Sequence, residues 1–185
     1  NLFAEAAVDY AQVRGAKIPE KYLLKNSPEE NADSLYREIG ELGARRVNLV
    51  GHSLGGIVIL HLLHRYPDID IDKVVLIGSP VRGSYVARRV YETQMLRPLL
   101  GRSIEKGLLG GAPEFACKRP LGIITGSGNL GLSALLYPTG DDSDGVVRES
   151  ETLIDNASDR VRLPLSHLII GSVAFKRSWP WLSFS

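Results

Sequence analysis

The most constraining feature of this chain is the run from Val47 to Gly56 (VNLVGHSLGG), which joins a short apolar stretch to a longer one. Residues 46–50 are apolar and rich in β-branched side chains, which favours a strand. Residues 54–66 are apolar at helical spacing, and Pro67 stops that pattern. The sequence therefore predicts a strand, a tight turn and a helix, with Ser53 at the turn.

The glycines beside Ser53 have a physical reason. A strand that turns sharply into a helix strains the backbone at the turn, and Gly51 and Gly55 avoid clashes with neighbouring backbone there. The Ser53 hydroxyl then projects at the start of the helix, where the Leu54 N–H can stabilise negative charge on a substrate carbonyl oxygen. This context is the one that the nucleophile pattern G-x-S-x-G requires. The alternative to a nucleophile is a glycine-rich turn in an unrelated α/β domain. A phosphate-binding loop fits less well, because the sequence has no G-x-x-x-x-G-K-[ST] pattern.

A serine nucleophile needs a general base, and the chain has four histidines. His52 adjoins Ser53, so its side chain points elsewhere and is expected to pack beside the site. His61 and His64 lie on the helix that runs away from the turn. Elimination and chain position favour His167, which we expect in a loop, with a surface histidine as the alternative.

The base needs an orienting acid, and the chain order Ser…Asp…His restricts the search to residues before His167. Asp144 is favoured because the following Gly145-Val146-Val147 would place it at the rim where the chain re-enters the fold. The alternatives are Asp141 and Asp142 as solvated loop charges, Asp68, Asp70 and Asp72 at the opposite end of the sheet, and Asp155 and Asp159 in a later polar segment.

The rest of the chain alternates helical and strand patterns. The run 27–30 (SPEE) combines an N-cap serine, a proline at the first helical position and a glutamate three residues after the cap, and Gly43 closes that helix. The other predicted elements are strands over 73–77, 121–125 and, more weakly, 161–165, helical segments over 1–14 and 84–109, and an extended segment over 16–25. Such alternation implies an α/β fold with a mostly parallel sheet and helices on both faces, in one domain over residues 1–185.

At these residues the chain resembles the α/β-hydrolase family, especially its bacterial lipases and esterases. The resemblance runs from about Ser27 to His167 and rests on GHSLGG, on Ser79-Pro80 after a strand, on SDGVV at 143–147 and on LSH at 165–167. It implies the roles of nucleophile, acid and base for Ser53, Asp144 and His167. It also implies that residues 81–118 form a small cap or lid over an acyl pocket.

Two departures from the family pattern suggest a fragment. Family members usually have a strand before the first helix, in the middle of the sheet, and its His-Gly loop supplies a second oxyanion N–H. Nothing of that kind precedes the helix expected at Asn1, so we expect the sheet to lack an N-terminal core strand. The family also continues with a long helix after His167, which the run 179–181 (WPW) interrupts here.

The resulting hypothesis is hydrolysis of a small carboxylic ester through an acyl-enzyme intermediate, with no cofactor and no metal. An apolar acyl group is expected because the proposed lid contributes several leucines, although these could equally be the lid's own packing: Leu96, Leu99, Leu100, Leu108 and Leu109. Acyl transfer or amide hydrolysis on the same three residues is one alternative. A non-catalytic binding or scaffold protein with a hydrolase fold is the other.

Composition narrows the partners and the compartment. The formal net charge of +1 gives no electrostatic reason to expect nucleic acid or an anionic membrane. A single cysteine, Cys117, excludes an internal disulfide. No run approaches the roughly 18–20 apolar residues of a membrane span, and no signal peptide is visible, which favours the cytoplasm. The chain begins with Asn1, so we expect its natural start to lie upstream.

Overall fold

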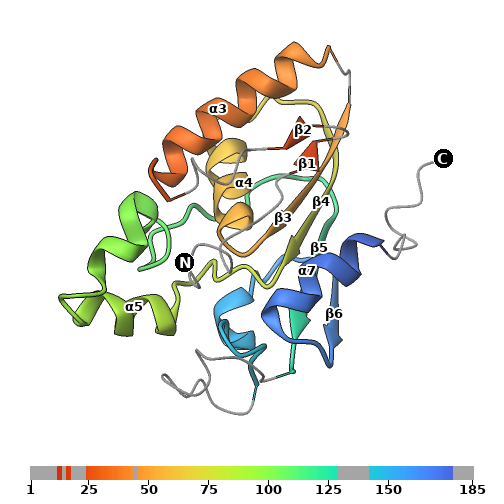
Figure 1. Cartoon of the computed structure of the whole chain (residues 1–185). Helices are drawn as coiled ribbons and strands as arrows, with labels where there is room; N and C mark the ends of the chain where they lie inside the picture. The colour runs from red at the N-terminus through yellow and green to blue at the C-terminus, as the bar shows by residue number, and fades with distance from the viewer. Residues whose placement is uncertain (1–11, 14–15, 18–23, 44–45, 129–141, 177–185) are drawn as a thin grey trace.

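A computed structural model describes residues 12–13, 16–17, 24–43, 46–128 and 142–176 (Figure 1). Its strands are β1 (Gln12–Val13), β2 (Ala16–Lys17), β3 (Val47–His52), β4 (Ile71–Ile77), β5 (Leu121–Gly126) and β6 (Asp159–Leu163). Its helices are α3 (Pro28–Glu41), α4 (Leu54–Arg65), α5 (Tyr85–Glu92) and α7 (His167–Lys176), with 3₁₀ segments η1 (Arg97–Ile104) and η2 (Glu149–Thr152).

The strands form one sheet in the order β2-β1-β3-β4-β5-β6, in which β3 to β6 run parallel. His52 pairs with Ile77, and Ile77 pairs with Ile124, so β3, β4 and β5 end at nearly the same level. The carboxyl ends of these strands therefore share one edge of the sheet. The predicted mostly parallel α/β sheet is confirmed.

Alternate residues along the strands face two different cores. Leu49, Leu76 and Ile123 belong to a large cluster with residues of α3 and α4. Val50 and Ile124 belong to a smaller cluster that includes Ile170 of α7. Because strand side chains alternate between faces, α3 and α4 cover one face of the sheet and α7 covers the other (Figure 1).

The N-terminal strands differ from the predicted helix over residues 1–14. Gln12 pairs with Val50 of β3, and β1 pairs in turn with β2, both antiparallel. Unpaired backbone groups at the open edge of β3 favour such pairing over helical spacing. Residues 1–11 lie outside the described part. Within it, these two-residue strands are the only ones before β3, and both run antiparallel.

The predicted helical segment over 84–109 is broken into α5 and η1. Pro98 lies at the start of η1, where its missing N–H is tolerated. Gly101 has a positive φ of 53°, and a Cβ there would lie 2.0 Å from the Leu24 carbonyl oxygen. Arg102 N–H donates to that same carbonyl. The chain therefore has to turn at this contact and cannot continue as one helix.

The predictions about membrane spans and about Cys117 can be compared with the structure. Within the described ranges, no helix has both the length and the apolar character that a bilayer crossing needs. Cys117 is a free, half-buried cysteine that packs against the larger core.

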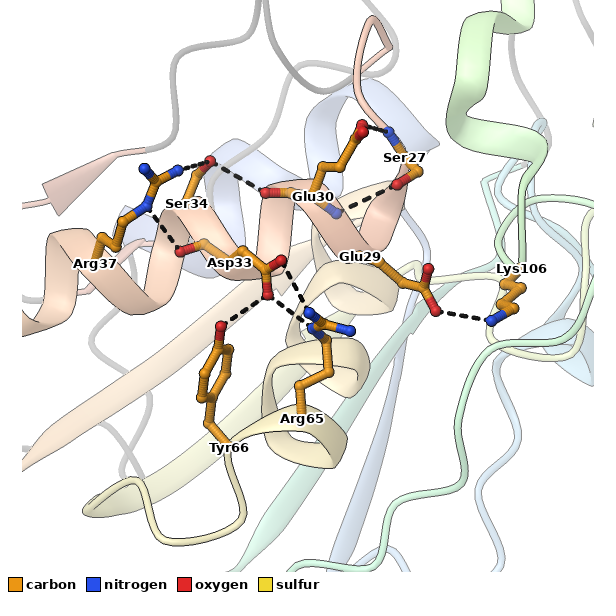
Figure 2. Close-up of polar contacts among 9 residues, drawn as sticks. All are labelled: Ser27, Glu29, Glu30, Asp33, Ser34, Arg37, Arg65, Tyr66 and Lys106. Atoms are coloured by element: carbon orange, nitrogen blue, oxygen red, sulfur yellow. Dashed lines mark hydrogen bonds and ion pairs between the residues drawn. The ribbon is translucent and has the colours of Figure 1, made fainter.

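Helix α3 begins with the predicted capping box (Figure 2). The Ser27 Oγ accepts a hydrogen bond from the Glu30 N–H at 3.2 Å, and the Glu30 carboxylate accepts one from the Ser27 N–H at 2.9 Å. Farther along, Asp33 binds the Arg65 guanidinium through two hydrogen bonds and the Tyr66 hydroxyl through a third. These contacts join α3 to the end of α4.

Replacing Ser27 with alanine should remove half of this capping box. We expect Ser27→Ala to lower the free energy of unfolding by about 1 kcal/mol, because the Glu30 N–H loses its acceptor. Urea unfolding followed by circular dichroism measures the change. Ser34→Ala in the same helix is the control and should stay within about 0.5 kcal/mol of the parent. Equal losses in both variants would contradict the capping role.

Candidate active site

Ser53 lies at a strained turn between β3 and α4. Its backbone φ is 51° and its ψ is −124°, a conformation rarely adopted by residues other than glycine. Two nearby glycines leave no room for a side chain, Gly51 because of the α4 backbone and Gly56 because of the Ser79 side chain. A Cβ on Gly51 would lie 2.7 Å from the Gly56 nitrogen and 2.8 Å from the Gly55 carbonyl carbon, and one on Gly56 would lie 2.1 Å from the Ser79 Oγ.

Asp144 and His167 form a buried hydrogen-bonded pair. His167 Nδ1 lies 2.6 Å from Asp144 Oδ2, and each side chain is 1% exposed. The other carboxylate oxygen, Oδ1, accepts the N–H groups of Val146 and Val147 at 3.0 and 2.7 Å. Because an ionised carboxylate only accepts, Nδ1 carries the donated proton and Nε2 of the neutral ring is an acceptor. This buried Nε2 has no hydrogen-bond partner among the described residues.

His167 is the first residue of α7, and the expectation that it would lie in a loop is wrong. Its N–H donates to the Asp144 carbonyl oxygen at 2.8 Å, while Ser166 accepts hydrogen bonds from the N–H groups of Ile169 and Ile170 through its own carbonyl. The signal for this helix start was present in the sequence. Ser166 is a residue type favoured at the N-cap, and it directly precedes an apolar run.

Gly78, which sequence reasoning did not single out, lies between Ser53 and the pair. The Ser53 N–H donates to the carbonyl of Ile77, and the Gly78 N–H donates to β5 at Ile124. A Cβ on Gly78, whose φ is +51°, would lie 3.1 Å from Asp144 Oδ2 and 3.3 Å from His167 Nδ1. The structure thus brings Ser53, Asp144 and His167 to the same edge of the sheet. The signal for Gly78 was its position directly after a buried strand.

The other histidines do not join this group as acid or base. His52 is buried beside His167, and its ring centroid lies 4.6 Å from the His167 ring centroid. His61 is buried on α4, where its Nε2 lies 2.8 Å from the Lys106 carbonyl oxygen, and burial lowers its pKa. His64 is exposed.

The alternative aspartates lie elsewhere or outside the described part. Asp142 is paired with Arg162, and Asp155 is paired with Arg82 and 93% exposed. Asp141 lies outside the described residues. The remaining four lie at the start of β4 or β6 or in the turn before β4, at the opposite end of the sheet from Ser53: Asp68, Asp70, Asp72 and Asp159.

A narrow cleft of about 70 Å³ opens beside Ser53. Its walls come from the segment before α3, from the turn at Ser53, from the insertion between β4 and β5 and from the loop after Asp144. Apolar side chains dominate, including Leu24, Leu54, Val86, Ala87, Val90, Leu99, Leu100, Leu108, Val146 and Val147. Of the five leucines expected at the acyl group, Leu99, Leu100 and Leu108 line the cleft, whereas the insertion's own cluster contains all except Leu99.

Glu151 is a buried carboxylate close to this cleft. One oxygen accepts the Tyr85 N–H at the start of α5, and the other accepts the Arg148 N–H. Burial raises the pKa of Glu151, partly offset by these two hydrogen bonds. The residue therefore connects the loop after Asp144 to the first helix of the insertion. Across the described ranges, no three His, Cys, Asp or Glu side chains are grouped as ligands for a metal ion.

The order of these features along the chain defines a fold class. A serine at a sharp strand-to-helix turn comes first, and a buried aspartate and histidine follow at the same edge of a parallel sheet. This is the arrangement of the α/β-hydrolase fold.

Comparisons with known proteins agree. Residues 29–100 match the family model described as the alpha/beta hydrolase fold. A putative carbamate hydrolase, RutD of Pantoea ananatis, is 43% identical over 60 residues, which are 32% of this chain and 22% of that protein's length. The mature lipase BlEst2 of Bacillus licheniformis superposes with a TM-score of 0.68 at 21% identity, covering 85% of this chain and 74% of the lipase. The metagenomic carboxyl esterase MGS0156 gives a TM-score of 0.55 at 18% identity, covering 85% and 59% of the two chains.

The described part of the chain therefore adopts the α/β-hydrolase fold, and the sequence match to that family's model covers residues 29–100. This is the fold that the sequence resembles, and the sequence match to the carbamate hydrolase spans about a fifth of that relative's length.

A side chain on Gly78 should disturb the buried pair. We expect Gly78→Ala to lower the free energy of unfolding by about 1–2 kcal/mol, because alanine is strained at a positive φ and its methyl group crowds Asp144 and His167. Urea unfolding measures the loss. Gly122→Ala on β5 is the control, since its Cβ would meet Val75 at 3.8 Å, an ordinary van der Waals distance. A Gly78 variant as stable as this control would contradict the close approach.

Proposed function

We propose that this protein is a serine hydrolase that cleaves carboxylic esters through an acyl-enzyme intermediate. The observation that carries the proposal is the buried Asp144–His167 pair, joined by a 2.6 Å hydrogen bond at Nδ1, with Nε2 of the imidazole unpaired among the residues that the structure describes. A histidine held in this tautomer is suited to accept a proton from a serine. Ser53, at the strained turn on the same edge, is the candidate nucleophile.

The proposed reaction has two halves. In the first, Ser53 Oγ attacks the ester carbonyl carbon while His167 Nε2 accepts the hydroxyl proton, and Asp144 stabilises the imidazolium that forms. His167 then donates this proton to the departing alcohol, which leaves an acyl ester on Ser53. In the second half, a water molecule loses a proton to His167 and attacks that ester, and the proton returns to Ser53 as the carboxylic acid leaves.

Negative charge develops on the carbonyl oxygen in both halves. Leu54 is the first residue of α4, and the first N–H groups of a helix have no partner within the helix. The Leu54 N–H and the positive end of the helix dipole are therefore suited to stabilise that oxygen.

The acyl part of the proposed substrate is apolar. The cleft beside Ser53 is lined mainly by aliphatic side chains, and burying such a group there removes apolar surface from water. Residues 81–118, which include α5 and η1, form the proposed lid, because Val90, Leu99 and Leu100 supply one wall of the cleft.

Carbamate cleavage by the same residues is the second candidate. The 60-residue match to a putative carbamate hydrolase at 43% identity favours it. The chemistry differs only in the group attached to the carbonyl carbon, so the same nucleophile and base would act. Comparing the rates of hydrolysis of matched ester and carbamate substrates separates the two candidates.

A fluorophosphonate probe tests the nucleophile and the base directly. We expect labelling of Ser53 in the parent protein, none in Ser53→Ala and strongly reduced labelling in His167→Ala, with the labelled peptide identified by mass spectrometry. Asp144→Asn should lower kcat on a p-nitrophenyl ester by about 10⁴-fold, because the amide favours the wrong imidazole tautomer.

Asp142→Asn is the control for the acid, because this neighbouring carboxylate is exposed and paired with Arg162. It should leave kcat unchanged. Folded parent protein that neither labels at Ser53 nor hydrolyses any ester or carbamate would contradict the proposed function and favour a scaffold role.

Narrowing the cleft should change the preferred acyl length. Ala87 lines the cleft from α5, so Ala87→Leu should lower the ratio of kcat/KM for p-nitrophenyl hexanoate over acetate by about tenfold. Arg88→Leu adds the same side chain at the exposed neighbouring position and should leave the ratio unchanged. An unchanged ratio in Ala87→Leu would show that the acyl group binds elsewhere.

A further inference from the structure

We propose that His52 is a positioning residue that holds the catalytic base His167 in register with Ser53. The proposal rests on the function proposed above. His52 is the last residue of β3, adjacent to Ser53 in the chain, and it is 4% exposed. The mechanism assigns it no proton transfer, yet its ring lies against the His167 ring.

The first contact is a hydrogen bond to the His167 backbone. His52 Nε2 lies 3.1 Å from the His167 carbonyl oxygen, across 115 positions of sequence. A carbonyl oxygen only accepts, so Nε2 of His52 must carry the proton and donate it. The hydrogen bond to the His167 carbonyl oxygen therefore fixes the tautomer of His52.

The second contact is between the two rings. Their centroids are 4.6 Å apart and the planes are tilted by 34°. The His167 N–H donates to the Asp144 carbonyl, so His52 completes a set of restraints on the backbone and the ring of the base. The His167 N–H and its Nδ1 are held by Asp144, while its carbonyl oxygen and one face of its ring are held by His52.

A glycine on α7 makes this approach possible. Gly171 lies one turn after His167, and a Cβ there would lie 3.2–3.3 Å from three atoms of the His52 ring. Such contacts are tighter than ordinary van der Waals packing. A larger residue at position 171 would press on the His52 ring. The glycine on α7 therefore leaves the space that this ring occupies.

These contacts give His52 a specific role in alignment. Because His52 is covalently next to Ser53, its hydrogen bond ties the base to the strand that carries the nucleophile. A misplacement of about 1 Å between reacting groups can cost about 10²-fold in rate. Loss of His52 should therefore slow the chemical step and leave substrate binding in the cleft unaffected.

Two substitutions separate the hydrogen bond from the ring. His52→Phe keeps an aromatic ring but removes the donor, whereas His52→Gln removes the ring but offers an amide N–H to the same carbonyl. We expect His52→Phe to lower kcat by about 10–100-fold with KM unchanged, and to lower the fluorophosphonate labelling rate similarly. His52→Gln should recover most of the loss. If His52→Phe does not fold, His52→Met, which also lacks a donor, replaces it.

His61→Phe is the matched control, because His61 is also buried on the same strand–helix unit and also lies within hydrogen-bond distance of a carbonyl oxygen, that of Lys106. It should lose comparable stability in urea unfolding while kcat stays within about twofold of the parent. A kcat in His52→Phe equal to that of the parent overturns the proposal. A His52→Gln variant as slow as His52→Phe overturns the role of the hydrogen bond.

A proton NMR measurement needs no turnover. The short His167 Nδ1–H···Asp144 bond should give a far-downfield proton, and His52→Phe should broaden or shift it because the ring is less well held. An unchanged resonance overturns the proposal. Absence of Ser53 labelling in the parent protein instead contradicts the proposed function, so the two failures are distinguishable.

Discussion

The left-handed backbone at Ser53 is the constraint on which the rest of the site depends. A non-glycine residue in this region costs about 1–2 kcal/mol, so surrounding contacts must hold it. The Ser53 N–H is bonded to β4, Gly51 lets β3 approach α4 closely, and Gly56 leaves room on α4 for the Ser79 side chain. The same hydrogen bond sets the register that puts Gly78 beside the turn. The backbone of this turn therefore determines both where Ser53 lies and where Asp144 and His167 can approach it.

The aspartate–histidine pair is held mainly by backbone groups. Burying a carboxylate and an imidazole is costly unless their polar atoms are paired. Asp144 meets this requirement with two N–H groups from its own loop and with the His167 ring, while its carbonyl accepts the His167 N–H. His52, at the end of β3, donates a hydrogen bond to the His167 carbonyl oxygen. Two restraints on His167 come from the Asp144 loop and one from β3, so the orientation of the imidazole depends on how β3, α7 and that loop pack together.

Local chemistry made much of this predictable from the sequence. The capping box at Ser27, the strands β3, β4 and β5 and the turn at Ser53 all have short-range signals, and the structure confirms them. The choice of Asp144 and His167 used chain order, and the structure brings these two residues into contact. Other features depend on tertiary contacts. Gln12 pairs with the edge of β3, and close contact with the Leu24 carbonyl kinks the segment after α5. The hydrogen bond of His52 joins residues that are 115 positions apart. No local pattern encodes such pairings.

The insertion that lines the cleft is held to the rest of the fold by buried hydrogen bonds at α5 and by exposed ion pairs near η1. These two kinds of contact differ in strength. At α5, the buried Glu151 carboxylate accepts the N–H of the first helical residue, and removing either partner would leave a polar group unsatisfied away from water. At η1 and just after it, Glu30 binds Arg102 and Glu29 binds Lys106 on the surface (Figure 2 shows the second pair). Solvent and salt screen exposed pairs, so they contribute little. The α5 wall of the cleft is therefore fixed to the Asp144 loop by buried contacts, whereas the exposed ion pairs of the η1 segment add little to the bond between the Arg102 N–H and the Leu24 carbonyl.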